Sequence, residues 1–256
     1  MACPLLIGLR MNLSLFQAAS GMNASARWQE ITAENLAASQ VPGFKRQQIS
    51  FEPVMAGAMP VPSTGVSNYV MPSSRVSTDF SPGGLRSTQV DTDVGIDGDG
   101  FFAVQLPSGE VGYTRDGEFH RSTSGQLLTK EGFAVLGDSG PVQLDPNNPK
   151  LFISPSGDIS QGGEPKGKLR IMKFDDPSRL TPSGAGLFVA SDPKIKSADV
   201  TTPSLRQGFL ELSNTNSVGE MAHMIESLRM FEANQRIIQS QDERMGKAIS
   251  ELTAGS

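Results

Sequence analysis

A tight turn in the middle of the chain carries a candidate nucleophile. The tetrapeptide Gly137-Asp138-Ser139-Gly140 has the residue types of a serine-protease nucleophile loop, although Pro141 stands where that loop has a further glycine. A catalytic serine needs a histidine base and a buried carboxylate that orients the base. The chain has two histidines: His120 on the outward side of a predicted strand, and His223 beside the apolar stripe of a predicted helix. We therefore interpret the tetrapeptide as a turn and expect no catalytic residues.

The aspartate-rich segment 91–99 could supply carboxylates to calcium. A calcium loop of the EF-hand type needs glycine at its sixth position and glutamate at its twelfth. Counting from Asp91 puts Ile96 at the sixth position, and counting from Asp97 puts Ser108 at the twelfth. A strand follows the glycines of this segment, where a dinucleotide site needs a helix, and two lone histidines do not make a zinc site. We expect no metal and no cofactor.

Charge and hydropathy limit the classes of partner. The chain of 256 residues has 27 acidic and 22 basic side chains, a net charge of −5. Such a chain has no overall basic field for nucleic acid, so we expect no nucleic-acid partner. Because no apolar run approaches the roughly 20 residues that span a bilayer, we also expect no membrane insertion. The 27 glycines and 17 prolines favour many short strands and turns.

Apolar residues at helical spacing predict a long helix over residues 11–41. They form a line that packs against another helix, with Gln29 as its one polar position. Pro42 and Gly43 end the pattern. The apolar members of this line are Leu15, Ala19, Met22, Ala26, Ala33 and Leu36. Residues 1–10 are interpreted as an N-terminal tail or an upstream start.

A second long helix is expected over residues 213–256. Ser217 and Glu220 have the spacing of a capping box at its start. Its apolar line has polar interruptions at Gln235 and Asp242 and consists of Met221, Met224, Leu228, Phe231, Ile238, Met245, Ile249 and Leu252. Ser227 and Arg236 are expected on the exposed side. Each of the two helices needs a partner for its narrow apolar stripe.

The central part of the chain alternates apolar and polar residues between turns. Residues 42–92 contain many Pro, Ser, Gly and Thr residues and are expected to form an extended connector. Residues 93–212 are expected to form an all-β domain, either a barrel or a sandwich-like meander. The predicted fold class is α+β, with the two terminal helices paired as a coiled-coil-like helical domain. The same stripes could pair within one monomer or also dock on neighbouring copies.

Four segments of the chain, in order, carry a family resemblance. They are ENLAASQVPGFKRQQISFE from residue 34, DVGIDGDGFFAVQ from 93, YTRDGEFHRSTSGQLLTKEGFAVLG from 113 and GFLELSNTNSVGEMAHMIESLRMFEANQRIIQSQDE from 208. Together they resemble the rod and hook axial proteins of the bacterial flagellum. The positions that match the family motifs are Asn35, Leu36, Ala37, Gly43, Phe44, Gly98, Gly100, Phe101, Asp116, Gly117, Glu211, Ser213 and Asn214. The chain departs from the family pattern at Thr215-Asn216, where Asn-Val is usual, and at residues 1–10, which precede the usual start.

The resemblance implies a structural subunit of the basal-body rod rather than an enzyme. Such a subunit is exported through the flagellar type III apparatus without a cleaved signal and polymerises helically into the drive shaft that crosses the periplasm. Its partners are copies of itself and other rod and hook axial proteins. The expected assembly interface consists of Leu15, Met22, Leu36, Met224, Leu228, Phe231, Ile238 and Met245.

The segment STDFSPGGLRSTQVDTDVGIDGDGFF, from Ser77, is similar to the proximal-rod member of this family. A distal-rod protein or a short hook-type axial protein is the alternative, although most hook proteins are longer. Two readings from other classes remain. One is a secreted β-domain adhesin or calcium module, and the other is a hydrolase with Ser139 as nucleophile.

Overall fold

The computed structural model describes residues 4–61, 65–146, 148, 150–184 and 186–254. Within these ranges it describes side chains from Leu15 to Glu52 and from Ser74 to Glu251. The chain divides into two compact units. The helical unit consists of Met1–Ala37, Gln47–Ser77 and Asn216–Ser256, and the β unit consists of Ala38–Arg46 and Thr78–Thr215.

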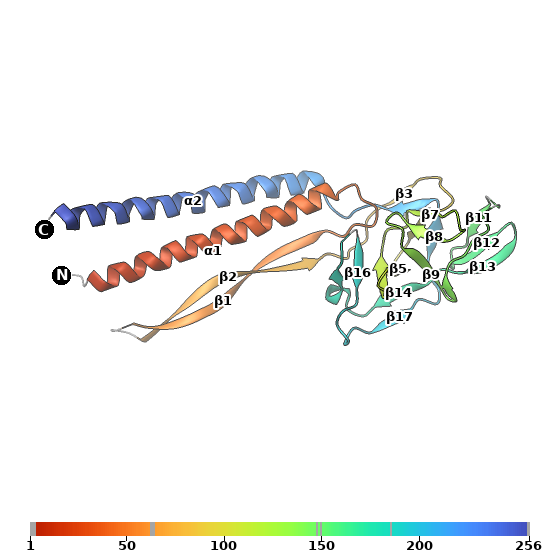
Figure 1. The fold of residues 1–256 in the computed structure, drawn as a ribbon, viewed down its shortest axis with the longest axis horizontal. Coiled ribbons are helices and arrows are strands. Elements are labelled where there is room, and N and C mark those ends of the chain that lie inside the picture. Colours follow the sequence, from red (N-terminus) through yellow and green to blue (C-terminus); the bar gives the residue numbers. More distant parts are fainter. Residues whose placement is uncertain (1–3, 62–64, 147, 149, 185, 255–256) are drawn as a thin grey trace. The chain divides into compact units, whose positions relative to one another are not determined.

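The helical unit contains the two longest helices and a two-stranded ribbon (Figure 1). Helix α1 spans Pro4–Ala37 and helix α2 spans Ser217–Ala254. Strands β1 (Gln47–Val61) and β2 (Gly65–Thr78) pair with each other as a separate sheet. The predicted extended connector thus contains two long strands. Neither described helix has a stretch that is long and apolar enough to cross a lipid bilayer.

Both predicted ends of the first helix differ from the structure. Helix α1 begins at Pro4 rather than at residue 11. Proline suits the first turn of a helix because its missing N–H would have no partner there, and no second proline lies between Pro4 and Met11. The helix ends at Ala37, before the expected residue 41, and the N–H of Val41 donates to the carbonyl of Ala38 at 3.0 Å in the turn that follows.

The apolar line predicted for α1 is wrong by one residue at its three alanines. Ala19, Ala26 and Ala33 are exposed, whereas Leu15, Met22 and Leu36 are partly buried as expected. Ile31 and Asn35 are buried on α1, and so are the residues one position before the three alanines, namely Ala18, Ser25 and Thr32. The last two can be buried because their hydroxyls donate to helix carbonyls four residues earlier, at 2.9 and 2.8 Å. A search for apolar residues alone passes over them.

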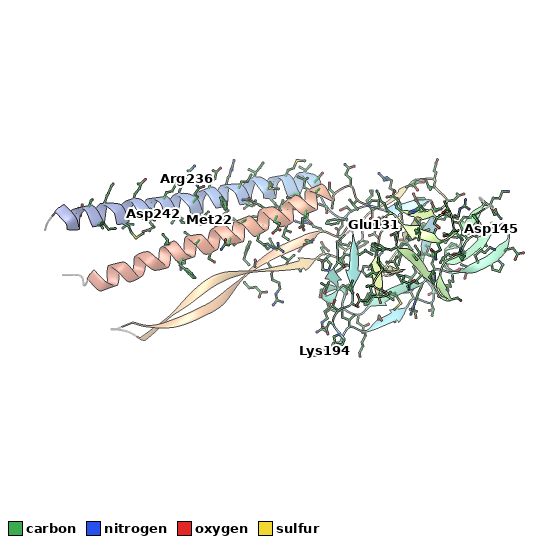
Figure 2. All side chains as sticks on the ribbon, in the orientation of Figure 1. Met22, Glu131, Asp145, Lys194, Arg236 and Asp242 are labelled. Carbon is green, nitrogen blue, oxygen red and sulfur yellow. The ribbon has the colours of Figure 1, made fainter. Side chains whose placement is uncertain are left out.

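In helix α2, too, the predicted apolar line differs from the buried face by one residue, at Leu228 and Ser227. Met224, Phe231, Ile238 and Met245 are partly buried, but Leu228 is 46% exposed. Ser227, expected on the exposed side, is completely buried, and its hydroxyl donates to the carbonyl of Met224 at 2.9 Å. Arg236 is exposed as expected, and Figure 2 labels it on α2. The side chain of Leu252, also expected in the line, lies outside the described side chains.

The two helices contact each other in antiparallel order (Figure 1). The side-chain amide of Gln29 donates to the carbonyl of Ser227 at 3.4 Å. Further along, Gly21 lies against Asn234, and a Cβ atom on Gly21 would be 2.9 Å from the Asn234 amide nitrogen. The interhelical surface is therefore partly polar. A coiled-coil geometry for this pair stays a prediction.

The start of α2 differs from the expected capping box. Ser217 is the first helical residue, and Asn216 is the cap. Its side-chain oxygen accepts from the N–H groups of Val218 and Gly219 at 3.2 and 3.4 Å. An asparagine satisfies free N–H groups at a helix start as well as a serine does. Asn216 is one of the two positions that depart from the family pattern, so this departure retains a cap.

The β unit contains short strands in several sheets. The largest sheet has ten strands, with the path β15-β16-β6-β5-β9-β8-β7, and β10, β14 and β17 pair beside that path. Smaller sheets are β11-β12-β13, β18-β4 and β19-β3. The strands are β3 (Leu85–Ser87), β4 (Val94–Ile96), β5 (Phe101–Gln105), β6 (Val111–Thr114), β7 (Phe119–Arg121), β8 (Leu127–Thr129), β9 (Ala134–Gly137), β10 (Gly140–Pro141), β11 (Leu151–Ile153), β12 (Asp158–Gln161), β13 (Glu164–Lys168), β14 (Ile171–Phe174), β15 (Thr181–Pro182), β16 (Leu187–Val189), β17 (Ser197–Asp199), β18 (Leu205–Gln207) and β19 (Phe209–Glu211).

The prediction of a barrel is wrong. A barrel closes only when the first and last strands of the sheet pair with each other, and β15 and β7 do not pair in the described part of the chain. The prediction of a mostly β middle region between two helices is confirmed. Its strands cover two apolar clusters, one around Phe102, Leu127 and Leu169 and one around Phe101 and Phe174.

Candidate functional site

Ser139 and the two histidines do not form a Ser–His pair in the described part of the chain. Ser139 is exposed in the turn between β9 and β10, where Gly140 pairs with Gly137. His120 is exposed on β7, and His223 contacts Trp28 in the helical unit, with ring centroids 6.0 Å apart. No hydrogen bond joins Ser139 to a histidine in the described part of the chain. The described residues also contain no group of three or more His, Cys, Asp or Glu side chains that could hold a metal.

The first turns of α2 carry an exposed apolar surface, here named the α2 outer patch. It consists of Val218, Met221, Ile225 and Leu228, which are 73, 51, 53 and 46% exposed. Their spacing of three, four and three residues places them on one side of the helix. The buried face of the helix carries Glu220, Met224 and Ser227 instead. The apolar line predicted from the sequence therefore merged two different faces of α2.

Asn35 joins three elements of the helical unit. Its side-chain oxygen accepts from the N–H of Gln47 at 2.9 Å, and its amide nitrogen donates to the carbonyl of Gln47 at 2.8 Å. The same nitrogen lies 3.3 Å from a carboxylate oxygen of the buried Glu220 on α2. The Asn35 amide thus pairs with the first residue of β1 as a strand backbone would. This contact gives a physical role to the asparagine of the Asn-Leu-Ala motif; Leu36 is partly buried and Ala37 is exposed.

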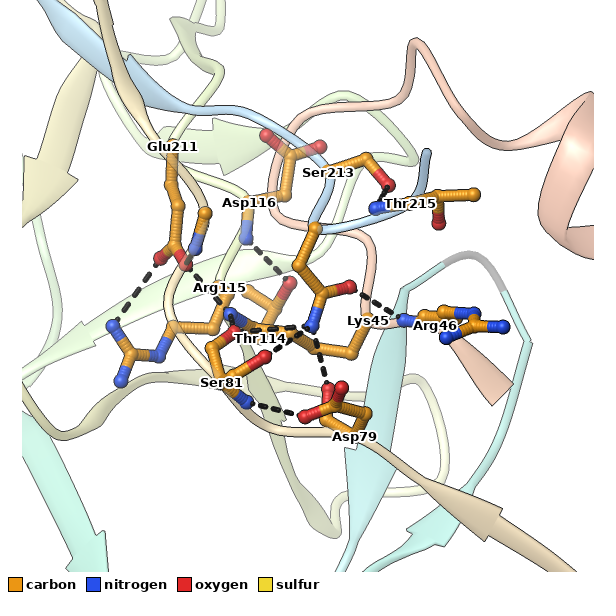
Figure 3. A network of polar contacts seen from close by, with 12 residues as sticks. Lys45, Arg46, Asp79, Ser81, Thr114, Arg115, Asp116, Glu211, Ser213 and Thr215 are labelled. Atoms are coloured by element: carbon orange, nitrogen blue, oxygen red, sulfur yellow. Dashed lines mark hydrogen bonds and ion pairs between the residues drawn. The ribbon is translucent and has the colours of Figure 1, made fainter. Parts of the chain in front are cut away.

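Three charged side chains meet in the interior of the β unit (Figure 3). One carboxylate oxygen of Glu211 accepts from the Lys45 ammonium at 2.6 Å, and the other accepts from the Arg115 guanidinium at 3.2 Å. The side chains are 1, 0 and 5% exposed, respectively. Burial lowers the pKa of Lys45 and that of Arg115, and the nearby Glu211 carboxylate opposes this shift for both. Within this triad two positive charges face one negative charge.

Backbone groups complete the triad. The Glu211 carboxylate also accepts from the N–H of Gly83 at 2.9 Å, and Lys45 donates to the carbonyl of Ser81 at 2.8 Å. The N–H of Gly43 donates to the backbone carbonyl of Glu211 at 2.8 Å. Segments far apart in the sequence are therefore fixed around one carboxylate.

Near the triad, Asn214 joins the segment that contains Arg46 to the segment 79–81. Its oxygen accepts from the N–H of Arg46 at 2.8 Å, and its nitrogen donates to the carbonyl of Asp79 at 2.8 Å and to that of Ser81 at 3.1 Å. The neighbouring Ser213 hydroxyl accepts from the N–H of Thr215 at 3.1 Å (Figure 3). The Thr215 hydroxyl is buried and has no hydrogen-bond partner. Substitution of threonine at this departure from the family pattern leaves a polar group unsatisfied.

Gly43 occupies a position that a side chain cannot share. Its φ of +67° lies in the left-handed region, as the sequence predicts for the residue after Pro42. A Cβ atom there would lie 2.3 Å from the backbone carbon of Arg115 and 2.3 Å from the backbone nitrogen of Asp116. Phe44, which follows, is partly buried, and its role as an anchor stays a prediction. The glycine is required both by conformation and by close packing of two backbones.

We expect Gly43→Ala to reduce the free energy of unfolding of the β unit by about 1–3 kcal/mol from backbone conformation alone. The contact with the Arg115–Asp116 backbone adds to this cost. Urea unfolding followed by near-ultraviolet circular dichroism measures it. Gly132→Ala is a matched control, because Gly132 also has a positive φ, +89°, but has open space around its Cβ position. Equal losses in the two variants would show that close packing at Gly43 contributes nothing.

Asp116 is a buried carboxylate beside Gly43. It is 9% exposed, and one of its oxygens accepts from the N–H of Glu118 at 2.9 Å. Burial raises its pKa to about 7, with smaller contributions in the same direction from Glu118 and Glu131, while Lys130 and the hydrogen bond from Glu118 lower it. The folded protein therefore prefers the neutral acid at this position.

The raised pKa makes stability depend on pH in a stated direction. Between the ordinary aspartate pKa of 3.8 and about 7, the folded state holds a proton that the unfolded state releases. Stability from this group is therefore highest at low pH and decreases as pH rises through this window, by at most about 1.4 kcal/mol per unit. Asp116→Asn keeps the acceptor for Glu118 and removes the titration. We expect the wild type to lose stability relative to Asp116→Asn from pH 5 to pH 7, because only the wild type titrates at this position. Urea unfolding of both proteins measures this, and a difference in unfolding free energy that does not change with pH would contradict it.

The remaining motif glycines serve the turns of the β unit. Gly98 and Gly100 have φ values of +128° and +134°, and a Cβ atom on Gly117 would lie 1.8 Å from the carbonyl oxygen of Val94. Phe101, which follows the glycine pair, is 4% exposed in the second apolar cluster. These motif positions are therefore structural.

The two buried cations have no role that the sequence predicts. Lys45 and Arg115 lie within the motif segments but were not singled out. Each stands directly beside a motif position, Lys45 after Phe44 and Arg115 before Asp116. A basic residue next to a motif phenylalanine or aspartate is the signal that the sequence offers.

Comparison with known proteins places these motifs in one family. The family model "Flagellar hook protein FlgE/F/G D1 domain" matches residues 95–161. The model "Flagellar basal body rod FlgEFG protein C-terminal" matches residues 206–251. The first range lies in the β unit, and the second contains β19 and most of α2. The matches thus include Arg115 and Glu211 of the triad and the buried Asp116.

Whole-length relatives carry the same family name. The flagellar basal-body rod protein FlgG of Buchnera aphidicola subsp. Schizaphis graminum is 32% identical over 262 residues, which cover 93% of this chain and 99% of the relative. FlgG of Borreliella burgdorferi is 33% identical, with 93 and 98% covered. The flagellar basal-body rod protein FlgF of Escherichia coli K12 is 31% identical, with 93 and 97% covered. On this similarity along nearly the whole of both chains, the protein belongs to the family of flagellar basal-body rod proteins.

Proposed function

We propose that this chain, a structural subunit of the flagellar basal-body rod, polymerises helically and that its terminal helices form the subunit contacts. The α2 outer patch supports the proposal, because four large apolar side chains remain exposed after α1 and α2 have paired. Exposed contiguous apolar surface on a protein marks an interaction site. Burying it against a neighbour would release the water that surrounds it.

The contacts in such a shaft join different faces of neighbouring copies. A heterologous interface of this kind builds an open helix rather than a closed ring when the rotation between copies does not close. The inner faces of α1 and α2 pair within the chain, which leaves their outer faces for neighbours. The proposed interface therefore centres on the α2 outer patch and includes Phe16 of α1, which is 56% exposed.

The interface residues expected from the sequence divide into two groups under this proposal. Leu228 belongs to the surface that contacts neighbours. The other members stabilise the helix pair and thereby shape that surface. They are Leu15, Met22, Leu36, Met224, Phe231, Ile238 and Met245, all partly buried.

Copies of this chain and other axial flagellar proteins are the proposed partners within the rod. The type III export apparatus is the proposed partner before assembly. The segment from Ser77 to Phe102, similar to the proximal-rod member, supports a proximal position. Relatives named FlgG and FlgF have nearly equal identities, 32 and 31%, so identity does not distinguish between the two names.

Imaging of labelled basal bodies tests the proposal. An epitope inserted between Ser108 and Gly109 would occupy an exposed turn between β5 and β6. Purified basal bodies should carry the label along the rod, and a proximal position predicts label at the end of the rod nearer the cytoplasm. Label on the hook alone, or basal bodies with no label from a strain that exports the protein, would contradict the proposal.

A further inference from the structure

The loop between β6 and β7, residues 115–118, packs closely against two other segments of the β unit. A Cβ atom on Gly43 would lie 2.3 Å from the backbone nitrogen of Asp116, and one on Gly117 would lie 1.8 Å from the carbonyl oxygen of Val94. The N–H of Val94 also donates to the carbonyl of Gly117 at 3.1 Å. This loop, here named the β6–β7 loop, therefore touches both the segment 38–46 that follows α1 and the start of β4.

The Asp116 side chain holds the β6–β7 loop in this shape. One carboxylate oxygen accepts from the N–H of Glu118 at 2.9 Å, and the N–H of Asp116 donates to the Thr114 hydroxyl at 3.0 Å (Figure 3). The residue is 9% exposed. Because the Asp116 backbone is the part of the loop that contacts Gly43, a movement that brings this carboxylate into water would also disturb that contact.

The charged groups that act on Asp116 are mostly negative. Burial is the main reason for its raised pKa, and Glu118 and Glu131 add to the shift, whereas the hydrogen bond from Glu118 and the Lys130 ammonium oppose it. Lys130 is paired with Glu118 at 3.4 Å, and its side chain is 63% exposed. The one cation that acts on Asp116 is therefore shared with another carboxylate and solvated.

The cations of the neighbouring segment act on other carboxylates. Segment 38–46 carries Lys45 and Arg46. Lys45 pairs with Glu211, and Arg46 lowers the pKa of Asp79. Gly43 itself contributes only backbone to the contact with the loop. Ionised Asp116 thus obtains no dedicated counter-charge from the segment against which it packs.

A second buried carboxylate lies beside the same loop. Asp93 is 5% exposed, and its backbone pairs with that of Glu118 in an isolated bridge. Burial raises its pKa and the Glu118 carboxylate acts in the same direction, while a hydrogen bond with Thr88 opposes the shift. Ionisation of Asp116 therefore adds a negative charge to a place that already contains several carboxyl groups, and a buried charge without a partner is costly.

We propose that Asp116 is a proton-controlled latch that keeps the β6–β7 loop closed against segment 38–46. The neutral acid stabilises the closed loop. Loss of the proton favours an open loop, in which the carboxylate reaches water while the rest of the β unit stays folded. This local opening is distinct from the unfolding of the whole unit, and it decides how firmly the chain is held just after α1 ends.

The direction of the pH dependence follows from the two states. In the closed loop the pKa of Asp116 is about 7, and in the open loop it returns to the ordinary 3.8. Between these values the closed loop holds a proton that the open loop releases. Each pH unit in this window therefore raises the ratio of open to closed loops by up to about ten-fold.

An NMR titration of the full-length wild type tests the coupling without any substitution. The Cγ shift of Asp116 should titrate with a midpoint near 7. The backbone amide shifts of Gly43 and Val94 should follow with the same midpoint, because both residues contact the β6–β7 loop. The amide of Val142, which donates to the carbonyl of Val135 at 2.9 Å, should not follow. A Gly43 amide that is indifferent to the titration of Asp116 would overturn the latch.

Hydrogen exchange at pH 5, 6 and 7 measures the opening. The N–H of Glu118 donates to Asp116, so its exchange, corrected for the intrinsic rate, should accelerate by up to about ten-fold per pH unit. Low concentrations of urea should leave this exchange unchanged, because a local opening exposes little surface. Exchange at Glu118 that depends on urea as steeply as exchange at Val142 would show that only global unfolding opens the loop, and the latch would be overturned.

Two substitutions separate Asp116 from general effects of charge. Asp116→Asn retains an acceptor for Glu118 and should abolish the pH dependence of exchange at Glu118. Asp91→Asn removes a carboxylate from an exposed position near Asp93 and should leave that dependence as in the wild type. Wild-type pH dependence in Asp116→Asn, or an equal loss in both variants, would overturn the assignment of the latch to Asp116.

Discussion

Replacing Glu211 with alanine is expected to destabilise the β unit by about 3–5 kcal/mol, which is a large part of the 5–15 kcal/mol that stabilises a typical domain. The substitution leaves the buried side chains of Lys45 and Arg115 without their shared counter-charge. It also removes the acceptor for the N–H of Gly83. Urea unfolding of the purified monomer measures the loss.

An exposed ion pair is the matched control for this substitution. Arg170 and Asp199 are paired at 2.9 Å, but their side chains are 40 and 60% exposed. Because water solvates each charge when its partner is removed, Asp199→Ala should cost less than about 1 kcal/mol. A similar loss in the two variants would mean that burial of the triad adds nothing to its energy.

A triple substitution separates charge from packing in the triad. Lys45→Met, Arg115→Met and Glu211→Leu together replace three charges with apolar side chains. Replacing a buried ion cluster in this way is often neutral, so the triple variant should recover much of the stability that Glu211→Ala loses. Recovery is incomplete because Lys45 also donates to the carbonyl of Ser81. No recovery would show that the loss comes from packing rather than from unpaired charge.

The motif residues were found from the sequence, but their meeting point was not. Glycines such as Gly43 can be predicted locally, since a turn after a helix and a proline calls for a left-handed residue. The contact of Gly43 with the Arg115–Asp116 backbone joins segments about 70 residues apart in the numbering. No local pattern contains that information. The charged triad was missed for the same reason, because a buried lysine has no periodic signature in the sequence.

The helix faces were predicted only in part because a helix with two apolar stripes has more than one plausible seam. In α2 the residues Met221 and Leu228 belong to the outer patch, while Met224 and Phe231 belong to the inner face. All four fall on a spacing of three and four residues, and hydrophobicity alone assigns them to one line. The buried Ser227 marks the face of α2 that packs against α1, but a search for apolar residues passes over a serine. The physical cause is that a small residue lets two helices approach closely even when it contributes little apolar area.

The pairing of β1 with β2 is a third feature that could not be predicted from the sequence. The two strands lie within a segment rich in proline and glycine, for which the sequence predicts an extended connector. Strand length depends on pairing between strands, and β1 and β2, of 15 and 14 residues, pair with each other. The alternation typical of a half-buried strand is weak there, so the extended backbone was predicted but the pairing was not.

Leu228→Ala is expected to block incorporation into the rod while leaving the monomer intact. Leu228 lies in the α2 outer patch and is 46% exposed, so its truncation should change the free energy of unfolding by no more than about 0.5 kcal/mol. If the patch contacts a neighbour, the lost apolar contact recurs in every subunit of the polymer. A modest loss per copy then becomes a large loss for elongation. The measurement compares the melting of the purified variant with its amount in purified basal bodies.

Phe231→Ala, one turn away, is the matched variant. Unlike Leu228→Ala, it is expected to lower the stability of the monomer. Phe231 lies on the partly buried face of α2, and its truncation should weaken the helix pair by about 1–3 kcal/mol. Trp28 reports that pairing, because it is the single tryptophan of the chain and contacts His223 of α2. Its fluorescence should change in Phe231→Ala and stay the same in Leu228→Ala. Arg236→Ala, on an exposed part of the same helix, should change neither property.

These three variants distinguish pairing within a chain from contact between chains. Lower monomer stability with Leu228→Ala would place Leu228 in the intramolecular pair and remove the outer patch as an interface. Normal incorporation of Leu228→Ala, with normal motility, would remove it as well. The expected result is a stable, exported and unassembled Leu228→Ala subunit. That result follows from an apolar surface which stays exposed after the chain has paired its own helices, since such a surface gains its main stabilisation from a neighbour.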